Sequence, residues 1–328
     1  MKALIYDGPE QLGFRDAPDP VAGPGEQLIR IEAVGICGSD MHAYLGHDER
    51  RPAPLILGHE AAGTIVGGPR DGERVTLNPL VTCGTCPACT SGRDNLCPTR
   101  MIISMPPREG AFAQYVTMRD ENLVSVPDAV PLTKAALAEP IGCGWHTVRL
   151  ARKALGRDGT ALVIGGGAIG LGAALSLTAQ GVTDVTVLEP NALRRAYLVD
   201  NCGQNAISPD DLPENTLFDL VIDGVGYAAT RATASAHARP GGVIGHIGLG
   251  EAAGGLDIRR MTLQEITFIG TYTYTAQDFR DTAAAIFDGR LGPLDWTTSC
   301  PLADGAAAFD DIRAGRIAAP KIILEPHS

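Results

Sequence analysis

The sequence predicts an α/β fold in which a doubly wound parallel sheet forms one domain and a discontinuous β-rich part forms the other. The first observation is the length of 328 residues, for which two domains are the usual organisation. The second is a β-rich N-terminal third, and the third is an alternation of strands and short helices from Gly159 onward. Such alternation indicates a parallel sheet covered on both faces.

The N-terminal part is predicted from short apolar runs that Gly, Pro and Asp interrupt. We expect strands at residues 1–6, 27–33, 61–66, 72–77, 111–117 and 122–126. Near Leu132 the pattern changes to small apolar residues at helical spacing, which predicts helix at 135–138 and 147–155.

The alternating part is predicted element by element. We expect strands at residues 160–164, 184–188, 218–222, 242–247 and 266–270, and helices at 171–180, 191–200 and 228–238. A closing strand at 321–324 is expected to rejoin the N-terminal sheet. The predicted domains are therefore residues 1–144 with 277–328, and residues 145–276.

Composition excludes several classes of partner. The chain is 45% hydrophobic and 20% charged, which is typical of globular proteins with buried cores. A net charge of −11 disfavours nucleic acid and anionic membrane surfaces, and no apolar run approaches the ~20 residues of a membrane span. The first residues lack the pattern of a secretion signal, so we expect a cytoplasmic, reducing location.

A cysteine quartet predicts a structural zinc lobe over residues 83–97. Its members are Cys83, Cys86, Cys89 and Cys97. Four thiolates satisfy a closed tetrahedral site, and the small polar residues between them offer little core, so a metal must hold the segment. The alternatives are two disulfides or four unrelated thiols, which a reducing location disfavours.

A glycine-rich turn predicts a dinucleotide site. It follows a predicted strand and opens a predicted helix, and its residues are Gly165, Gly167, Ala168, Ile169 and Gly170. Glycine allows a tight turn and lets a pyrophosphate approach the start of the helix. The alternative is a glycine-rich turn that binds no ligand, which the combined strand–turn–helix context disfavours.

Glu189 ends the next predicted strand and favours NAD. A carboxylate there accepts hydrogen bonds from the ribose hydroxyls and repels a 2′-phosphate. Arg194 and Arg195, on the following helix, are the alternative partners that could hold such a phosphate, but Glu189 and not the arginines stands at the expected distance from the turn.

A second metal site is suggested by Cys37, His59 and Glu60. One thiolate, one imidazole and one carboxylate from separate loops suit a catalytic zinc with an open coordination position. Spacing alone leaves open that these are ordinary core and surface residues.

Together these motifs resemble the zinc-dependent medium-chain alcohol and polyol dehydrogenases, and the sorbitol dehydrogenase-like branch in particular. The resemblance rests on Gly-Ile-Cys37-Gly-Ser-Asp, Gly58-His59-Glu60-Ala-Ala-Gly, the cysteine lobe, Asp71-Gly-Glu-Arg-Val75 and the glycine-rich turn, in the family's order. It implies a Rossmann domain, a GroES-like catalytic domain, two zinc ions per chain and NAD. It also implies a small alcohol or ketone substrate and a homo-oligomer, either dimer or tetramer.

The resemblance also implies residue roles. Cys37 and His59 match catalytic zinc ligands, and Glu60 matches the carboxylate that binds the metal directly or through water. Ser39 matches the start of a proton relay, and His42 matches the histidine that passes the proton to solvent.

The remaining ligand is either Glu139 or Cys143. Glu139-Pro140 fits the polyol branch, whereas a cysteine serves in the ethanol-type branch; on a helix the two side chains share one face. Cys37 and one glutamate already neutralise Zn²⁺, which preserves its ability to acidify an alcohol, so we assign Cys143 to packing.

One departure bears on the substrate. Sorbitol-type enzymes carry an arginine after the last Rossmann strand, and Gly270 to Tyr274 contain none. We therefore expect NAD-linked oxidation of a secondary alcohol or small polyol. The alternatives are an aldose, threonine-type or primary-alcohol dehydrogenase of the same family, a nucleotide-binding structural protein with only the structural zinc, and a zinc-finger interaction module, which the acidic charge disfavours.

Overall fold

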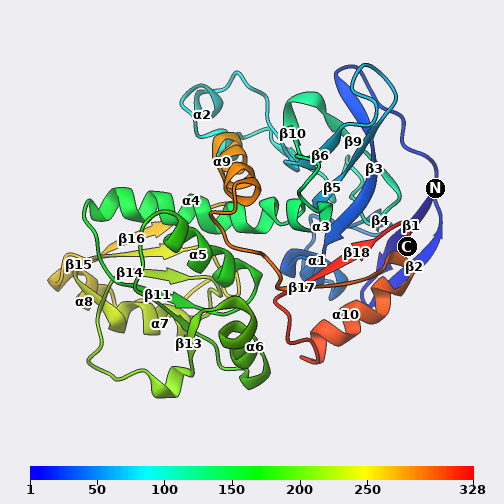
Figure 1. The fold of residues 1–328 in the computed structure, drawn as a ribbon. Coiled ribbons are helices and arrows are strands. Elements are labelled where there is room, and N and C mark those ends of the chain that lie inside the picture. The colour runs from blue at the N-terminus through cyan, green and yellow to red at the C-terminus, as the bar shows by residue number, and fades with distance from the viewer.

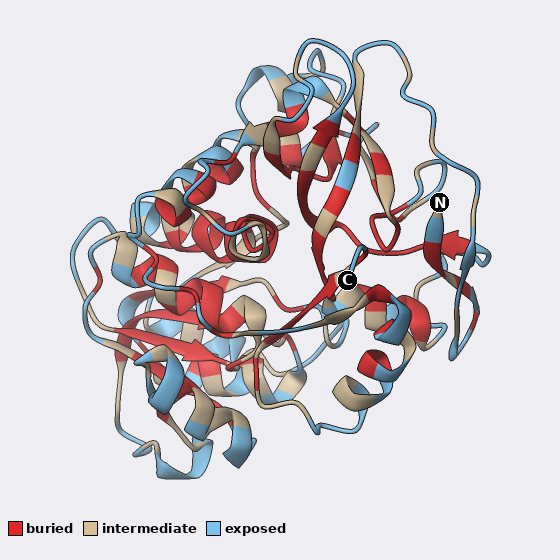
Figure 2. Ribbon diagram, turned by 45° about the vertical axis from the view of Figure 1, so that its right-hand side comes forward, coloured by how far each residue is buried: buried red, intermediate tan, exposed pale blue.

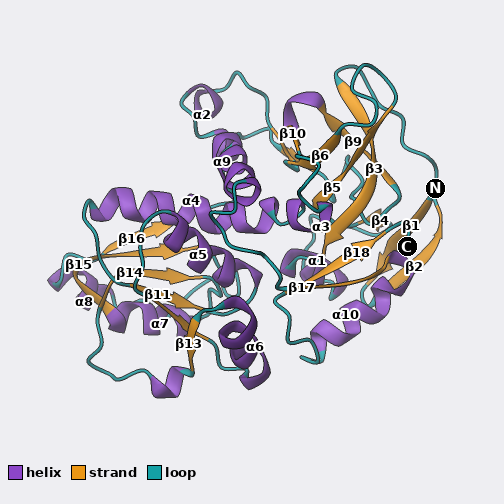
Figure 3. Ribbon diagram, in the orientation of Figure 1, coloured by secondary structure: helices purple, strands orange, loops and turns teal.

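Two large sheets lie side by side in the computed structural model, which describes all residues from Met1 to Ser328 (Figure 1). One sheet is mostly antiparallel and belongs to a β-rich part of the chain. The other is parallel with helices on its faces, as the colouring by secondary structure shows (Figure 3). The predicted fold class is confirmed. None of the helices combines the length and apolar character that a membrane-crossing segment requires.

The β-rich part is built around a seven-stranded sheet of order β10-β6-β5-β3-β18-β17, with β9 also paired to β3. Its strands are β1 (Lys2–Gly8), β2 (Gln11–Asp16), β3 (Glu26–Gly35), β4 (Leu55–Ile56), β5 (Glu60–Val66), β6 (Arg74–Leu77), β7 (Leu80–Val81), β8 (Met101–Ile102), β9 (Tyr115–Arg119), β10 (Leu123–Ser125), β17 (Thr297–Pro301) and β18 (Lys321–Glu325). Its helices are α1 (Gly38–Tyr44), α2 (Pro87–Thr90), α3 (Leu132–Ala135) and α10 (Gly305–Arg313).

The other part is a six-stranded parallel sheet of order β13-β12-β11-β14-β15-β16. Its strands are β11 (Ala161–Ile164), β12 (Val185–Leu188), β13 (Asn205–Ile207), β14 (Phe218–Asp223), β15 (Ala238–His246) and β16 (Thr267–Gly270). Its helices are α4 (Ala138–Leu155), α5 (Ala168–Ala179), α6 (Ala192–Cys202), α7 (Ala228–His237), α8 (Ile258–Leu263) and α9 (Ala276–Phe287).

The last strand returns to the N-terminal sheet. β18 pairs antiparallel with β3, Ile323 opposite Gly35, and parallel with β17. The β-rich part is therefore discontinuous in sequence. The expected boundary at 144/145 falls within α4, which runs from one part into the other, and the division at these residues remains a proposal.

The strand predicted at residues 111–117 begins four residues later in the structure, where β9 starts at Tyr115. The amides of Ala111 and Phe112 donate to the carbonyls of Gly58 and Leu57. The start of this segment is therefore hydrogen-bonded to the loop before β5 and does not extend β9.

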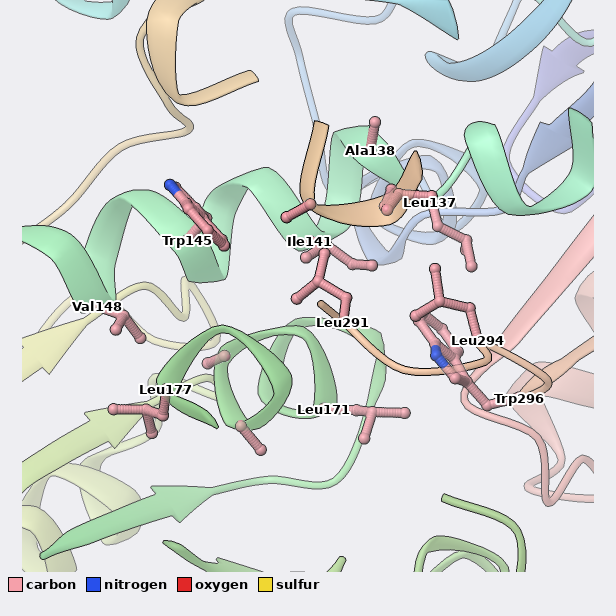
Figure 4. Packing of buried hydrophobic residues seen from close by; sticks show 14 of the residues in the cluster. Leu137, Ala138, Ile141, Trp145, Val148, Leu171, Leu177, Leu291, Leu294 and Trp296 are labelled. Atoms are coloured by element: carbon pink, nitrogen blue, oxygen red, sulfur yellow. The ribbon is translucent and has the colours of Figure 1, made fainter. Parts of the chain in front are cut away.

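Helix α4, which runs between the two parts, packs closely on α5. A side chain at Gly144 would lie 2.6 Å from the backbone nitrogen of Ala173, so glycine is required for this approach. Large apolar side chains flank the contact, including Ile141, Trp145 and Leu171 (Figure 4). The central strands β5, β11 and β14 are almost wholly buried, as are the residues of α4 and α5 at this contact, whereas the outer strands are partly exposed (Figure 2). The start of α4 is thereby held at a fixed place relative to the start of α5.

Candidate active site and cofactor cradle

Cys37, His59 and Glu60 are brought together where the start of α1 meets the start of β5, at the end of the paired strands β3 and β5. Cys37 caps the start of α1, where its sulfur accepts a hydrogen bond from the Ser39 amide at 3.5 Å, and Glu60 begins β5 opposite Gly35. The ligand atoms of the three residues lie within 4.8 Å of one another. One sulfur, one imidazole nitrogen and one carboxylate oxygen at this spacing fit a single zinc ion.

His59 is oriented by groups that the sequence did not single out. Asp40 Oδ1 and Ser104 Oγ each lie 3.4 Å from Nδ1, which leaves Nε2 on the side of Ser39 Oγ, 3.5 Å away. Burial opposes protonation of His59, but the Asp40 carboxylate outweighs burial and raises the pKa of the imidazole. A carboxylate partner of this kind fixes ring orientation and ligand basicity in zinc sites.

Glu60 is paired with Lys321 from the last strand. Lys321 Nζ donates to Glu60 Oε1 at 2.7 Å and to the Ile36 carbonyl at 2.8 Å, and both side chains are buried. The pair compensates one carboxylate charge before any metal binds. No local pattern around Lys321 signalled this role, because β18 reaches Glu60 only through its pairing with β3.

Glu139 and Cys143 both lie on α4, beside the three-residue group but outside it. Tyr274 Oη donates to Glu139 Oε1 at 2.8 Å. Burial, with a contribution from Glu60, raises the pKa of Glu139 to about 7. Burial and the Glu139 carboxylate likewise raise the pKa of the Cys143 thiol well above its usual value. The two candidates lie one turn apart on a single helix, the arrangement that helical spacing predicted.

The predicted proton relay is only partly assembled. Ser39 lies against His59, but His42 is exposed and forms no hydrogen bond with Ser39; its ring lies 6.4 Å from that of His47. Arg51, which sequence reasoning missed, instead reaches Ser39. Its guanidinium is 2% exposed, donates to Ser39 Oγ at 3.5 Å and to the Ser104 carbonyl at 3.0 Å, and pairs with Asp48 at 2.6 Å.

The cysteine lobe also fits a zinc ion. All eight cysteines are free thiols, and the sulfur of Cys89 lies 3.9 Å from that of Cys83 and 3.5 Å from that of Cys86. Zn–S bonds of about 2.3 Å in a tetrahedron place sulfurs about 3.8 Å apart, which matches this spacing. The four ligand atoms, including that of Cys97, lie within 4.8 Å of one another.

The glycine-rich turn forms an open cradle at the start of α5. A side chain at Gly170 would strike the Gly165 carbonyl, whereas one at Gly167 would meet nothing within 4 Å. Gly170 therefore lets the helix pack onto the turn, and Gly167 leaves the backbone open to a pyrophosphate. Ala168 and Ile169 supply the amides of the first turn of α5.

Glu189 has a structural role that the sequence did not reveal. Its Oε2 accepts from the Gly166 amide at 2.9 Å and its Oε1 from the Asn191 amide at 2.8 Å. The carboxylate therefore holds the cradle while keeping lone pairs for ribose hydroxyls. Arg194 points elsewhere, toward the Ile317 carbonyl at 3.5 Å, and its Nε is buried without a partner.

Comparison with known proteins agrees with this geometry. Residues 23–128 match the alcohol dehydrogenase GroES-like domain, and residues 168–288 match the zinc-binding dehydrogenase domain. The chain is 36% identical to sorbitol dehydrogenase of Bacillus subtilis over 76% of its own length and 75% of that protein's. It is 31% identical to L-galactonate-5-dehydrogenase of Escherichia coli over 89% of its length and 88% of that protein's.

Solved structures give the same result. A short chain alcohol dehydrogenase from Escherichia coli CFT073 in complex with NADH superposes with a TM-score of 0.89 at 26% identity, covering 99% of both chains. Acetophenone reductase from Geotrichum candidum in complex with NAD superposes with a TM-score of 0.85, also at 26% identity, covering 99% of this chain and 96% of that one. With its two cysteine-containing metal groups, its glycine-rich cradle and these relatives, the chain belongs to the zinc-dependent medium-chain alcohol and polyol dehydrogenases, and its cofactors are zinc and NAD.

Proposed function

We propose that this dehydrogenase interconverts a secondary alcohol or small polyol and the corresponding ketone, with NAD as hydride acceptor. The observation that carries the proposal is the group of Cys37, His59 and Glu60, of which the last two are buried, with Ser39 beside it. When bound, zinc supplies Lewis acidity toward an alcohol and NAD supplies the acceptor. The relatives named for sorbitol and L-galactonate support a hydroxylated substrate.

The chain's own residues divide the remaining tasks. Cys37 and His59 are proposed to hold the catalytic metal, and Glu60 and Glu139 to adjust its charge. Ser39 Oγ is proposed to take the substrate proton, because it is the hydroxyl nearest His59 Nε2. Arg51 donates to Ser39 Oγ, which leaves the hydroxyl free to orient its own proton.

An uncharged, non-phosphorylated substrate is proposed from the segment after β16. The family's arginine is absent there, and the buried hydroxyl of Thr273 has no hydrogen-bond partner. A neutral hydroxyl suits a small polyol better than a phosphorylated sugar, because residues 270–274 themselves supply no cation to pair with a phosphate.

An NAD-reduction screen tests the proposal. The panel pairs 2-butanol with 1-butanol and adds 2,3-butanediol, sorbitol and a sorbitol phosphate. We expect the secondary alcohol or diol to give a kcat/KM at least tenfold above its primary isomer. Preference for the primary alcohol would contradict the proposal.

A homo-oligomer and a cytoplasmic location are proposed in addition. β16 is the outer strand of the parallel sheet, and the neighbouring Leu249, Ile258 and Leu263 are largely exposed. Exposed apolar side chains beside a sheet edge are suited to contact with a second copy. Sedimentation equilibrium tests the dimer or tetramer, and a monomer at micromolar concentration would contradict it.

A further inference from the structure

We propose that Tyr274 is the positioning residue for Glu139, and that the four-cysteine lobe holds Tyr274 in place through residues 271–276. The inference rests on the proposed function, because Glu139 matters only as part of the catalytic metal site. The cysteine lobe would then help to position a residue of the catalytic metal site, in addition to stabilising its own fold.

The Glu139 carboxylate has one hydrogen-bond donor in the protein. Tyr274 Oη lies 2.8 Å from Oε1, and no other protein hydrogen bond reaches this carboxylate. Both side chains are buried, Tyr274 at 1% exposure and Glu139 at 5%. A single buried donor therefore determines where the carboxylate points.

The tyrosine ring packs closely against α4 at a glycine one turn after Glu139. A side chain at Gly142 would lie 2.9 Å from Tyr274 Cδ1, so the ring occupies the space that any other residue would fill. The ring also packs on that of Phe279, with centroids 5.6 Å apart. The ring has little freedom, and the direction of its hydroxyl is fixed.

The segment that carries Tyr274 is bound on both sides by residues of the cysteine lobe. Before Tyr274, the Asn95 side chain donates to the Tyr272 carbonyl at 2.8 Å. After it, Asp94 Oδ2 accepts from the Ala276 amide, at the start of α9, at 2.9 Å. The Arg100 guanidinium also lies over the Tyr272 ring, 4.7 Å from its centroid. Tyr274 thus lies between two contacts with the lobe.

A physical coupling follows from these contacts. The lobe contains few apolar side chains, so its fold depends on its metal. Partners of metal-directed groups change metal affinity by about 10–100-fold when they are lost. Release of residues 271–276 from the lobe should therefore weaken the catalytic site without touching any of its ligands.

The first experiment removes only the hydroxyl. Tyr274→Phe keeps the ring against Gly142 but leaves Glu139 without its donor. Tyr272→Phe is the matched control, because its hydroxyl meets only Arg100, at 3.4 Å. Zinc affinity is measured by chelator competition, and ligand geometry by the visible absorption of the Co²⁺-substituted protein. We expect about 10–100-fold weaker binding at the catalytic site and an altered spectrum for Tyr274→Phe alone.

The second experiment tests the route from the lobe. Asn95→Ala is made in the wild type and in Tyr274→Phe. The lobe control is Thr90→Ala, whose hydroxyl donates only to the carbonyls of Cys86 and Pro87 and does not contact residues 271–276. Asn95→Ala should weaken catalytic zinc binding in the wild type and add nothing in the Tyr274→Phe background. Asp94→Ala, which removes the acceptor of the Ala276 amide, replaces Asn95→Ala if the latter does not fold.

The outcomes separate the inference from the proposed function. Unchanged zinc affinity and Co²⁺ spectrum in Tyr274→Phe, or additive effects of the two substitutions, overturn the inference even if the enzyme oxidises alcohols. A wild type that binds two zinc ions but oxidises no alcohol overturns the proposed function, and the metal-binding measurements still decide the inference.

Discussion

Lys321 Nζ lies 2.7 Å from both carboxylate oxygens of Glu60, a residue 261 positions earlier in the chain. The two side chains are 3% and 1% exposed, so neither charge has water to compensate it. Glu60 therefore enters the metal group as half of a buried ion pair.

Lys321→Met should destabilise the protein by about 3–5 kcal/mol, because it leaves Glu60 buried and unpaired. Glu60→Gln combined with Lys321→Met removes both charges and should recover a large part of that loss. Urea unfolding of the metal-free protein measures the free energies. A double variant as unstable as the sum of the single variants would contradict the pairing.

Asp278 should give the α4–α9 junction a dependence on acid pH. Burial favours protonation of Asp278, but hydrogen bonds from His146 and Arg149 outweigh it and hold the carboxyl pKa well below its usual range. Such a group stabilises the fold above its unfolded pKa of about 3.9, and this contribution is lost as pH falls toward the lower folded value.

Asp278→Asn should cost about 1.5–3 kcal/mol at pH 7, a range for charge-assisted hydrogen bonds that allows for solvent screening of Arg149, which is 40% exposed. The difference in unfolding free energy between the wild type and Asp278→Asn should be constant between about pH 5 and 8. It should decrease below about pH 4. Asp281→Asn, a half-buried carboxylate on the same helix that accepts a hydrogen bond only from the Gln277 side chain, should show neither effect.

Glu139 and Cys143 should differ when each is replaced. Glu139→Ala is expected to lower catalytic metal content or turnover by about 10–100-fold. Cys143→Ala should stay active with a small loss of stability, because a further thiolate would make the site anionic. Loss of the catalytic zinc in Cys143→Ala but not in Glu139→Ala would place the site with the two-cysteine, ethanol-type branch.

The two metals should leave at different rates. The four-thiolate lobe is closed, whereas the site of Cys37 and His59 keeps an open position, so chelation should remove the catalytic zinc first. Elemental analysis during dialysis against a chelator, alongside activity, follows both. One zinc per chain in active protein would contradict the two-site assignment.

Glu189 should determine the choice of dinucleotide. Glu189→Ala removes the ribose acceptor and the carboxylate bound to the Gly166 amide, so NAD binding should weaken and preference should shift toward NADP. Arg194→Ala, on the following helix, should leave NAD binding nearly unchanged. A wild type that binds NADP tenfold more tightly than NAD, a difference of about 1.4 kcal/mol, would contradict this role of Glu189.

Local sequence alone was enough for the features that depend on neighbours in the chain. The cysteine spacing, the strand–glycine–helix turn and the strand–helix alternation each arise within about thirty residues, where covalent geometry and period decide the outcome. For the same reason the sequence placed Glu139 and Cys143 on one helix face, and it identified Cys37, His59 and Glu60 from motifs that a family shares.

Only the tertiary structure decided which partners surround those residues. Lys321 meets Glu60 because β18 pairs with β3, and Tyr274 meets Glu139 because α9 packs beside α4. Arg51 reaches Ser39 from a loop with no recognisable pattern. Contacts between distant segments depend on sheet order, strand register and the packing of whole helices, and no local period in the sequence encodes them.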